Sequence, residues 1–167
     1  MGRDPSMIEF LWWALYTVCA VWIQDVIPGA DCFGPALVLC LQAGRYKNVI
    51  WLAPIWILLQ EGAGSLPFGS ALLYYAGLVY FFFLIRAYIN TSSHMYILSL
   101  SVFAGLWHLG VIHLITSLQD IQIVSQQILL QSARIAAVFP VLWAIASLIY
   151  HLRIAPRYVR IRFPGTE

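Results

Sequence analysis

Six apolar runs, separated by short polar or Gly/Pro-containing stretches, constrain this chain more than any other feature. The chain is 62% hydrophobic and 10% charged, whereas soluble domains average about 45–50% apolar and about 25% charged residues. Water could not surround so much apolar surface, so lipid must be the solvent of the folded chain. The sequence therefore predicts an all-α, polytopic membrane helix bundle that forms one domain over residues 1–167. The expected spans are Met7–Ile27, Pro35–Gln42, Val49–Gln60, Ser70–Ile89, His94–Ser117 and Ser132–His151.

The second and third runs, Pro35–Gln42 and Val49–Gln60, are shorter than the roughly 17–25 residues of an ordinary span. They would be either thin crossings or a re-entrant pair that is buried in protein. Arg45 and Lys47 in the turn between them favour full crossing, because both charges would otherwise lie deep in the membrane.

Positive charge predicts the orientation of these spans. If the chain starts in the cytoplasm and crosses six times, eight of its nine Lys and Arg residues fall on the cytoplasmic side, which is the positive-inside pattern. Both termini are then cytoplasmic, and residues 152–167 form a basic tail. Only Arg134 falls on the outer side. The cytoplasmic residues are Arg3, Arg45, Lys47, Arg86, Arg153, Arg157, Arg160 and Arg162.

Two local features concern the fifth and sixth runs. Ser92 or Ser93 would cap the start of the fifth helix. Residues Leu118–Gln131 carry apolar side chains at helical spacing among several glutamines. They predict an amphipathic helix at the outer interface or a continuation of helix five or six beyond the membrane.

A Gly-rich loop after the third run supplies the main candidate site residues. Glu61 follows an apolar run, where a carboxylate needs water, a cation or helix N-terminal amides as a partner. The glycines permit tight turns and the proline stiffens them. The loop would hold a partner or close a pocket, or its acid would simply be solvated. The candidate residues are Glu61, Gly62, Gly64, Ser65, Pro67 and Gly69.

Outside that loop, His108 and Arg134 are candidate contacts. His108 lies near the middle of the fifth run and would contact another helix, a ligand or a hydrogen-bonding neighbour in the bundle. Arg134 would extend to lipid headgroups or pair with an outer acid. We interpret the outer acids Asp25, Asp31 and Asp120 as solvated span ends rather than as a metal site, because they share no ligand spacing.

No residue set predicts catalysis, a metal site or a cofactor. The three cysteines have no CxxC spacing, and the chain has no P-loop, dinucleotide fingerprint, zincin helix or nucleophile elbow. The net charge of +2, with its basic residues near membrane ends, argues against nucleic acid as a partner. We therefore expect a binding protein without catalytic activity, with an intramembrane enzyme as the weaker alternative.

The stretch Leu58–Gly69, followed by Tyr74 and Tyr75, resembles the MreD family of rod shape-determining proteins. That family has an acidic residue and a Gly-Ser-Pro-Leu-Gly-like turn at the end of its third span. By position, Glu61 matches the usual Asp of the family. Gly64-Ser65 matches its Gly-Ser pair, and Gly69 matches its closing Gly. Here Leu66-Pro67-Phe68 makes the turn one residue longer, and Gly34-Pro35 stands where Arg-Pro often opens the second span.

The resemblance implies a non-catalytic scaffold subunit of the bacterial cell-elongation machinery, which builds peptidoglycan. Its partners would be lipid, an MreC-like single-span protein and the peptidoglycan synthase complex. The family's fold is similar to the substrate-binding subunits of energy-coupling-factor transporters, so a vitamin or small-molecule carrier is the alternative. Those subunits often have small residues at i and i+4 on the first helix, whereas Ala14 here is followed by Val18. Ala133 and Ala137 have that spacing on the last helix.

Overall fold

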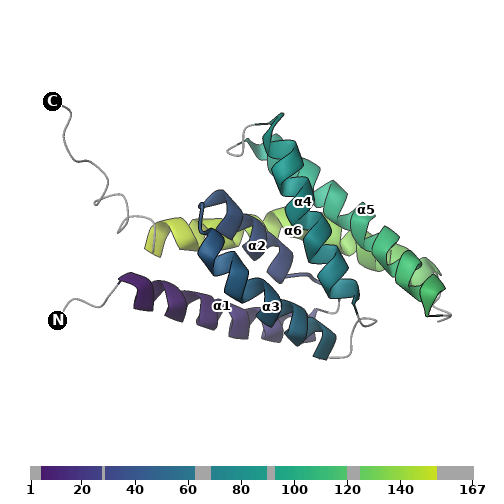
Figure 1. The fold of residues 1–167 in the computed structure, drawn as a ribbon, viewed down its shortest axis with the longest axis horizontal. Coiled ribbons are helices and arrows are strands. Elements are labelled where there is room, and N and C mark those ends of the chain that lie inside the picture. Colours follow the sequence, from purple (N-terminus) through teal and green to yellow (C-terminus); the bar gives the residue numbers. More distant parts are fainter. Residues whose placement is uncertain (1–4, 28, 63–68, 90–92, 120–124, 154–167) are drawn as a thin grey trace.

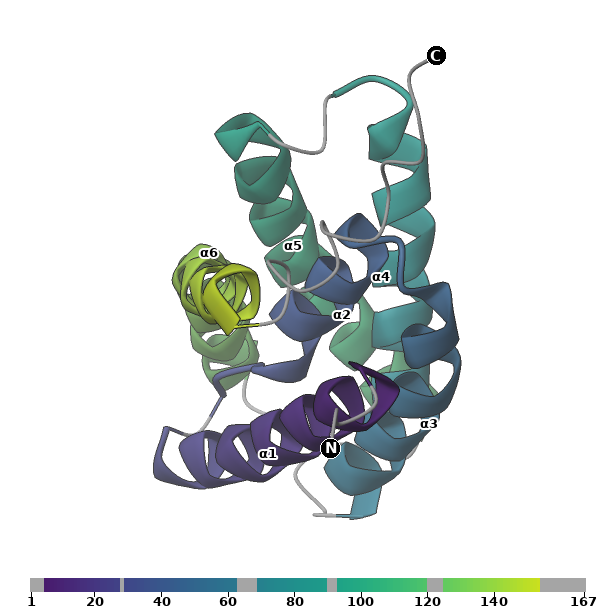
Figure 2. The same ribbon diagram turned by 90° about the vertical axis from the view of Figure 1, so that its left-hand side faces the viewer.

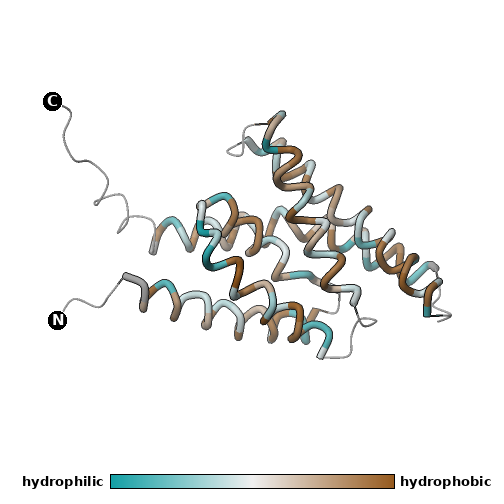
Figure 3. Tube along the Cα trace, in the orientation of Figure 1, coloured by the Kyte–Doolittle hydropathy of each residue, from teal (hydrophilic) through white to brown (hydrophobic). Residues whose placement is uncertain are grey.

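The computed structural model describes residues 5–27, 29–62, 69–89, 93–119 and 125–153. Within these ranges the chain has six helices and no strand, so the all-α prediction is confirmed. Three helices are long and apolar enough to cross a membrane, over Met7–Val26, His94–Leu118 and Gln126–Leu152. Hydrophobic residues occur along every helix (Figure 3). The helices are α1 (Pro5–Val26), α2 (Phe33–Gln42), α3 (Tyr46–Gly62), α4 (Ser70–Arg86), α5 (His94–Leu118) and α6 (Ser125–Arg153).

Helix α2 occupies the centre of the bundle. Figure 2 shows α2 surrounded by the other five helices, and it packs directly against α3, α4 and α6. Every residue from Phe33 to Leu41 is buried, and ten residues of helix extend only about 15 Å. The hydrocarbon core is about 30 Å thick, so both predicted alternatives, a thin crossing and a re-entrant segment, remain compatible with a helix of this length.

Helix α3 is longer than the predicted Val49–Gln60 run. It begins at Tyr46 and continues through Pro54 to Gly62. An interior proline removes one backbone hydrogen bond, but membrane helices tolerate prolines because neighbouring groups satisfy the freed backbone. With 17 residues, α3 approaches the length of an ordinary span.

Aromatic side chains attach α1 to the rest of the bundle. The Trp13 side chain is only 1% exposed, and its ring lies 6.2 Å from that of Trp56 in α3 and 6.1 Å from that of Tyr150 in α6. The Tyr16 hydroxyl donates a hydrogen bond to the Cys32 carbonyl at 2.7 Å. Bulky side chains therefore span the gap between α1 and its neighbours, where the backbones do not approach closely.

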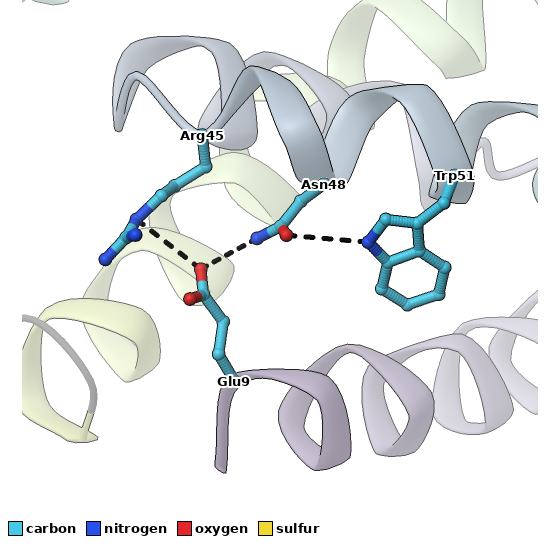
Figure 4. A network of polar contacts seen from close by, with 4 residues as sticks. All are labelled: Glu9, Arg45, Asn48 and Trp51. Carbon is cyan, nitrogen blue, oxygen red and sulfur yellow. Dashed lines mark hydrogen bonds and ion pairs between the residues drawn. The ribbon is translucent and has the colours of Figure 1, made fainter. Parts of the chain in front are cut away.

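A polar network fixes the start of α1 against the turn between α2 and α3 (Figure 4). Glu9 Oε1 accepts a hydrogen bond from Asn48 Nδ2 at 2.7 Å and lies 3.5 Å from Arg45 Nε. Asn48 Oδ1 in turn accepts from Trp51 Nε1 at 3.5 Å. Glu9 is only 7% exposed, so the cation and the amide compensate a carboxylate that would otherwise be costly near lipid.

Helices α5 and α6 form the most extensive helix pair. Ser93 caps α5, because its hydroxyl accepts a hydrogen bond from the Met95 amide at 3.3 Å. Residues 125–131 belong to α6, so for this part the prediction of a continuation of helix six is confirmed. These residues therefore do not form a separate interfacial helix. Of the rest of the predicted stretch, Leu118 is the last residue of α5, Gln119 is its C-cap, and residues 120–124 lie outside the described residues.

The helix ends divide between two ends of the molecule (Figure 1). The start of α1, the α2–α3 turn and the end of α6 lie towards the left of the view, and the end of α4 lies at the top. The ends of α1, α3 and α5 and the starts of α4 and α6 lie towards the right. Arg45 and Lys47 lie at the α2–α3 turn, and Arg86, the last residue of α4, donates a hydrogen bond to the nearby Tyr46 hydroxyl at 3.0 Å.

The close approach of α5 and α6 predicts a sharp difference between two glycines of α5. A Cβ at Gly105 would lie 2.8 Å from both the Ala136 Cβ and the Ser132 carbonyl oxygen, whereas a Cβ at Gly110 would meet nothing within 4 Å. We expect Gly105→Ala to lower the free energy of unfolding by about 1–3 kcal/mol. Gly110→Ala should be neutral or slightly stabilising, because alanine favours helix.

Thermal or denaturant unfolding of both variants in the same detergent measures this difference. Equal stability of the two alanine variants would contradict the tight α5–α6 contact.

Candidate functional site

A cavity of about 830 Å³ lies where the ends of α1, α3 and α5 meet the starts of α4 and α6. Its volume is within the range of small-molecule sites, about 300–1,000 Å³. Apolar side chains form part of the wall, but the cavity also gathers many of the polar residues of this apolar chain. The polar lining residues are Gln24, Asp25, Asp31, Gln60, Ser70, Tyr74, His108, Gln127, Gln131 and Arg134.

Helical periodicity brings these polar residues to the cavity. Gln127, Gln131 and Arg134 of α6 stand at i, i+4 and i+7 and therefore share one face of that helix. Gln24 and Asp25 follow the same rule on α1, three and four residues after Val21, which also lines the cavity. The sequence therefore places a polar stripe near the end of α1 and another near the start of α6, and the fold turns both towards one space.

Asp31 is the most deeply integrated polar residue of the cavity wall. Its side-chain Oδ1 accepts hydrogen bonds from the amides of Phe33 at 3.0 Å and Gly34 at 3.1 Å, the first two residues of α2. The same oxygen accepts from the Tyr75 hydroxyl at 3.1 Å and from Gln60 Nε2 at 3.5 Å. One carboxyl oxygen thus caps α2 and links it to α3 and α4.

The interpretation of Asp31 as a solvated span end is wrong. Its exposed fraction is 8%, because its carboxyl group bonds to the buried start of α2 and to side chains of α3 and α4. Burial raises the pKa of the Asp31 carboxyl, although hydrogen bonds from Gly34 and Tyr75 oppose that increase. Asp25 is exposed, as expected for a span end, and Asp120 lies outside the described residues.

Gly34 is required by this arrangement. A Cβ at Gly34 would overlap Asp31 Oδ2 and would press on the Phe139 ring at 3.4 Å. Only a residue without a side chain leaves room for the carboxyl group above the first turn of α2.

His108 contributes a polar contact between helices, one of its predicted roles. It is 4% exposed, its Nδ1 lies 3.0 Å from Ser132 Oγ of α6, and its ring meets that of Tyr74 edge to face at 5.8 Å. Tyr74 is equally buried, and its hydroxyl has no hydrogen-bond partner among the described residues. Asp31 Oδ2 has none there either.

The structure connects the two ends of the Gly-rich loop. Glu61 Oε1 accepts a hydrogen bond from the Gly69 amide at 3.0 Å, and Gly69 is the N-cap of α4 with a φ of +86°. The acid therefore bonds to an amide at a helix N-terminus, where negative charge is favoured. Gly69 is needed because L-residues rarely adopt this φ.

The other predicted site residues fall into two groups. Gly62 and Arg134 line the cavity together with His108, whereas Glu61 and Gly69 meet at the end of α3. Gly64, Ser65 and Pro67 lie outside the described residues. A Cβ at Gly62 would meet nothing within 4 Å, so no contact there requires a glycine.

Sequence reasoning missed Asp31, Gln60 and Tyr74 as parts of one site. One signal was available for Asp31. An Asp that precedes a helix commonly accepts hydrogen bonds from the amides two and three residues further along the chain, and so caps the helix. No such local signal exists for Gln60 and Tyr74, whose proximity depends on how α3 and α4 pack.

Chemically, the site offers one guanidinium, two carboxyl groups and several amides around a partly apolar space. Such a lining suits binding, since it supplies hydrogen bonds and charges of both signs to one small polar group.

We expect Asp31→Ala to destabilise the fold, because it leaves the first amides of α2 and the Tyr75 hydroxyl without their acceptor. The loss should be about 1–3 kcal/mol, the usual cost of buried polar groups without partners. Asp25→Ala is the matched control and should cost less than about 0.5 kcal/mol, since Asp25 is an exposed side chain. Unfolding midpoints in one detergent compare the two, and a similar small effect of both would refute the capping role of Asp31.

No protein-family model matches this chain, and no curated protein or solved structure matches it either.

Proposed function

We propose that this chain is a non-catalytic scaffold subunit of the bacterial cell-elongation machinery, located in the inner membrane. It acts by binding other membrane proteins, namely an MreC-like single-span protein and the peptidoglycan synthase complex. The observation that best supports this proposal is the hydrogen bond from the Gly69 amide to Glu61 Oε1. It joins the acidic residue and the closing glycine on which the resemblance to the MreD family is based.

That hydrogen bond joins the end of α3 to the start of α4. Glu61 accepts from the amide of the α4 N-cap, and Gly69 supplies the left-handed residue there. Fixing these two positions relative to each other lowers the entropic cost of binding a partner at them.

Six crossings with both termini in the cytoplasm belong to the same proposal. Support comes from the distribution of helix ends. Arg86 at the end of α4 donates a hydrogen bond to the Tyr46 hydroxyl at the start of α3 at 3.0 Å, and the end of α6 lies on the same side of the view as the α2–α3 turn (Figure 1). A shared cytoplasmic side for these positions follows the positive-inside rule.

The outer surfaces of the helices support action within the membrane. Large apolar side chains are exposed on α1, α3, α4, α5 and α6, among them Trp22, Leu58, Tyr80, Leu106 and Leu148. Lipid or the spans of partner proteins would cover such surfaces.

A substrate-binding membrane subunit of a vitamin or small-molecule transporter is the second candidate. The observation that favours it is the cavity of about 830 Å³ with its mixed polar lining, because a scaffold needs no such space.

The role of Glu61 predicts different outcomes for two substitutions. Glu61→Ala removes the acceptor of the Gly69 amide, so recovery of the single-span protein and the synthase in a mild-detergent pull-down should fall several-fold. Glu61→Gln keeps a carbonyl oxygen at the same position and should retain most of the recovery. Both variants should insert into the membrane like the parent chain.

Unchanged recovery with Glu61→Ala would remove Glu61 from the partner site. Recovery of a bound vitamin and an ATPase module, in place of those two partners, would favour the carrier.

The orientation predicts where reporter fusions become active. Fusions near residue 46 and at the carboxyl end should both report the cytoplasm, and a fusion between α3 and α4 should report the outer side. Opposite signals from residue 46 and the carboxyl end would contradict the six-span arrangement.

A further inference from the structure

The cavity between α1, α3, α4, α5 and α6 carries charges of both signs. Arg134 supplies a guanidinium from α6, Asp25 supplies a carboxylate from α1, and Asp31 forms part of the wall. We propose that this cavity binds a zwitterionic group in which a primary amine accompanies a phosphate or carboxylate. This inference does not rest on the scaffold role, because it follows from the lining of the cavity alone.

The anionic part of the ligand would lie against α6. Arg134 shares its helix face with Gln127 and Gln131, so a guanidinium and two amides face the same space. A guanidinium binds the planar or tetrahedral oxygens of carboxylate and phosphate through two parallel N–H donors. The amides add hydrogen bonds without adding charge.

The amine would lie against the carboxyl groups of Asp25 and Asp31. A primary ammonium has three N–H donors, and Asp25 and the neighbouring Gln24 offer acceptors at the end of α1. A quaternary amine has no N–H to donate, so the site should distinguish the two kinds of amine.

Two deeply buried residues in the wall provide an independent indication of a ligand. Tyr74 and Asp31 are 4% and 8% exposed, and both line the cavity. The Tyr74 hydroxyl and the Asp31 carboxyl interact with each other, but neither that hydroxyl nor Asp31 Oδ2 has a partner at full hydrogen-bonding geometry among the described residues. Buried polar atoms are normally paired, so such atoms beside a cavity point to a polar occupant.

The rim of the cavity indicates how a ligand would enter. Val21, Leu58, Leu59 and Leu130 line the cavity and are 40–70% exposed, which gives the opening an apolar edge. The headgroup of phosphatidylethanolamine has the required amine and phosphate, and its acyl chains would follow that edge. A free amino-acid-like molecule has the same chemistry without the chains.

The experiment uses the full chain, purified and stripped of lipid in detergent, and native mass spectrometry of bound lipid. The probes are dioleoyl lipids with an ethanolamine, choline or glycerol headgroup. Ethanolamine has the primary amine, choline has a quaternary amine, and glycerol has no amine. We expect at least tenfold tighter binding of the ethanolamine lipid than of either alternative.

Three substitutions and a control locate this binding. Arg134→Gln and Asp25→Asn should each reduce binding of the ethanolamine lipid to the level of the choline lipid. Arg134→Lys keeps the charge but loses the paired donors, and should give an intermediate affinity. Arg86→Gln, the same chemical change at the other end of α4, should leave binding unchanged, and equal unfolding midpoints would show that all four variants fold.

Equal binding of the three lipids, or full binding by Arg134→Gln, would overturn the proposal. Competition with soluble glycerophosphoethanolamine separates the two ligand sources. Displacement of the lipid by this headgroup at millimolar concentration would support a free zwitterion as the ligand. Resistance to displacement, together with headgroup selectivity, would support the lipid.

Discussion

The bundle depends on a carboxyl group that is buried at the start of its central helix. Every residue of α2 from Phe33 to Leu41 is buried, so its first amides need an acceptor within the protein. Asp31 supplies that acceptor and also binds Tyr75 and Gln60. The same oxygen therefore satisfies the end of α2 and fixes the positions of α3 and α4 around it.

Polar side chains gather at opposite ends of this apolar molecule, and each group has a different consequence. At the end with the basic turn, Glu9, Arg45 and Asn48 bond to one another and hold α1 in place. At the other end, the polar residues surround a cavity of about 830 Å³. Only the second group borders a space, so its side chains can contact a ligand in addition to their partners in the protein. The candidate site therefore lies at the second end.

Several features of the fold were predictable because they depend on neighbours in the chain. The long apolar runs predicted helices, and Ser93 predicted the start of α5, since hydrophobic periodicity and capping are local properties. The sequence also predicted that Glu61 needs a polar partner, because it follows an apolar run. Helix N-terminal amides were among the expected partners. The cavity was not predictable, because Gln24, Gln60 and Gln131 come from three helices whose contacts depend on packing.

By itself, the sequence determined the helical class, the membrane as solvent and the position of most helix ends. These properties follow from composition and short-range patterns, which every conformation of the chain shares. Only the tertiary structure decided that Asp31 is buried, that α2 lies at the centre and that His108 meets Ser132. An isolated Asp between two helices looks the same in sequence whether it meets water or a helix end, and only the packing of distant segments distinguishes the two.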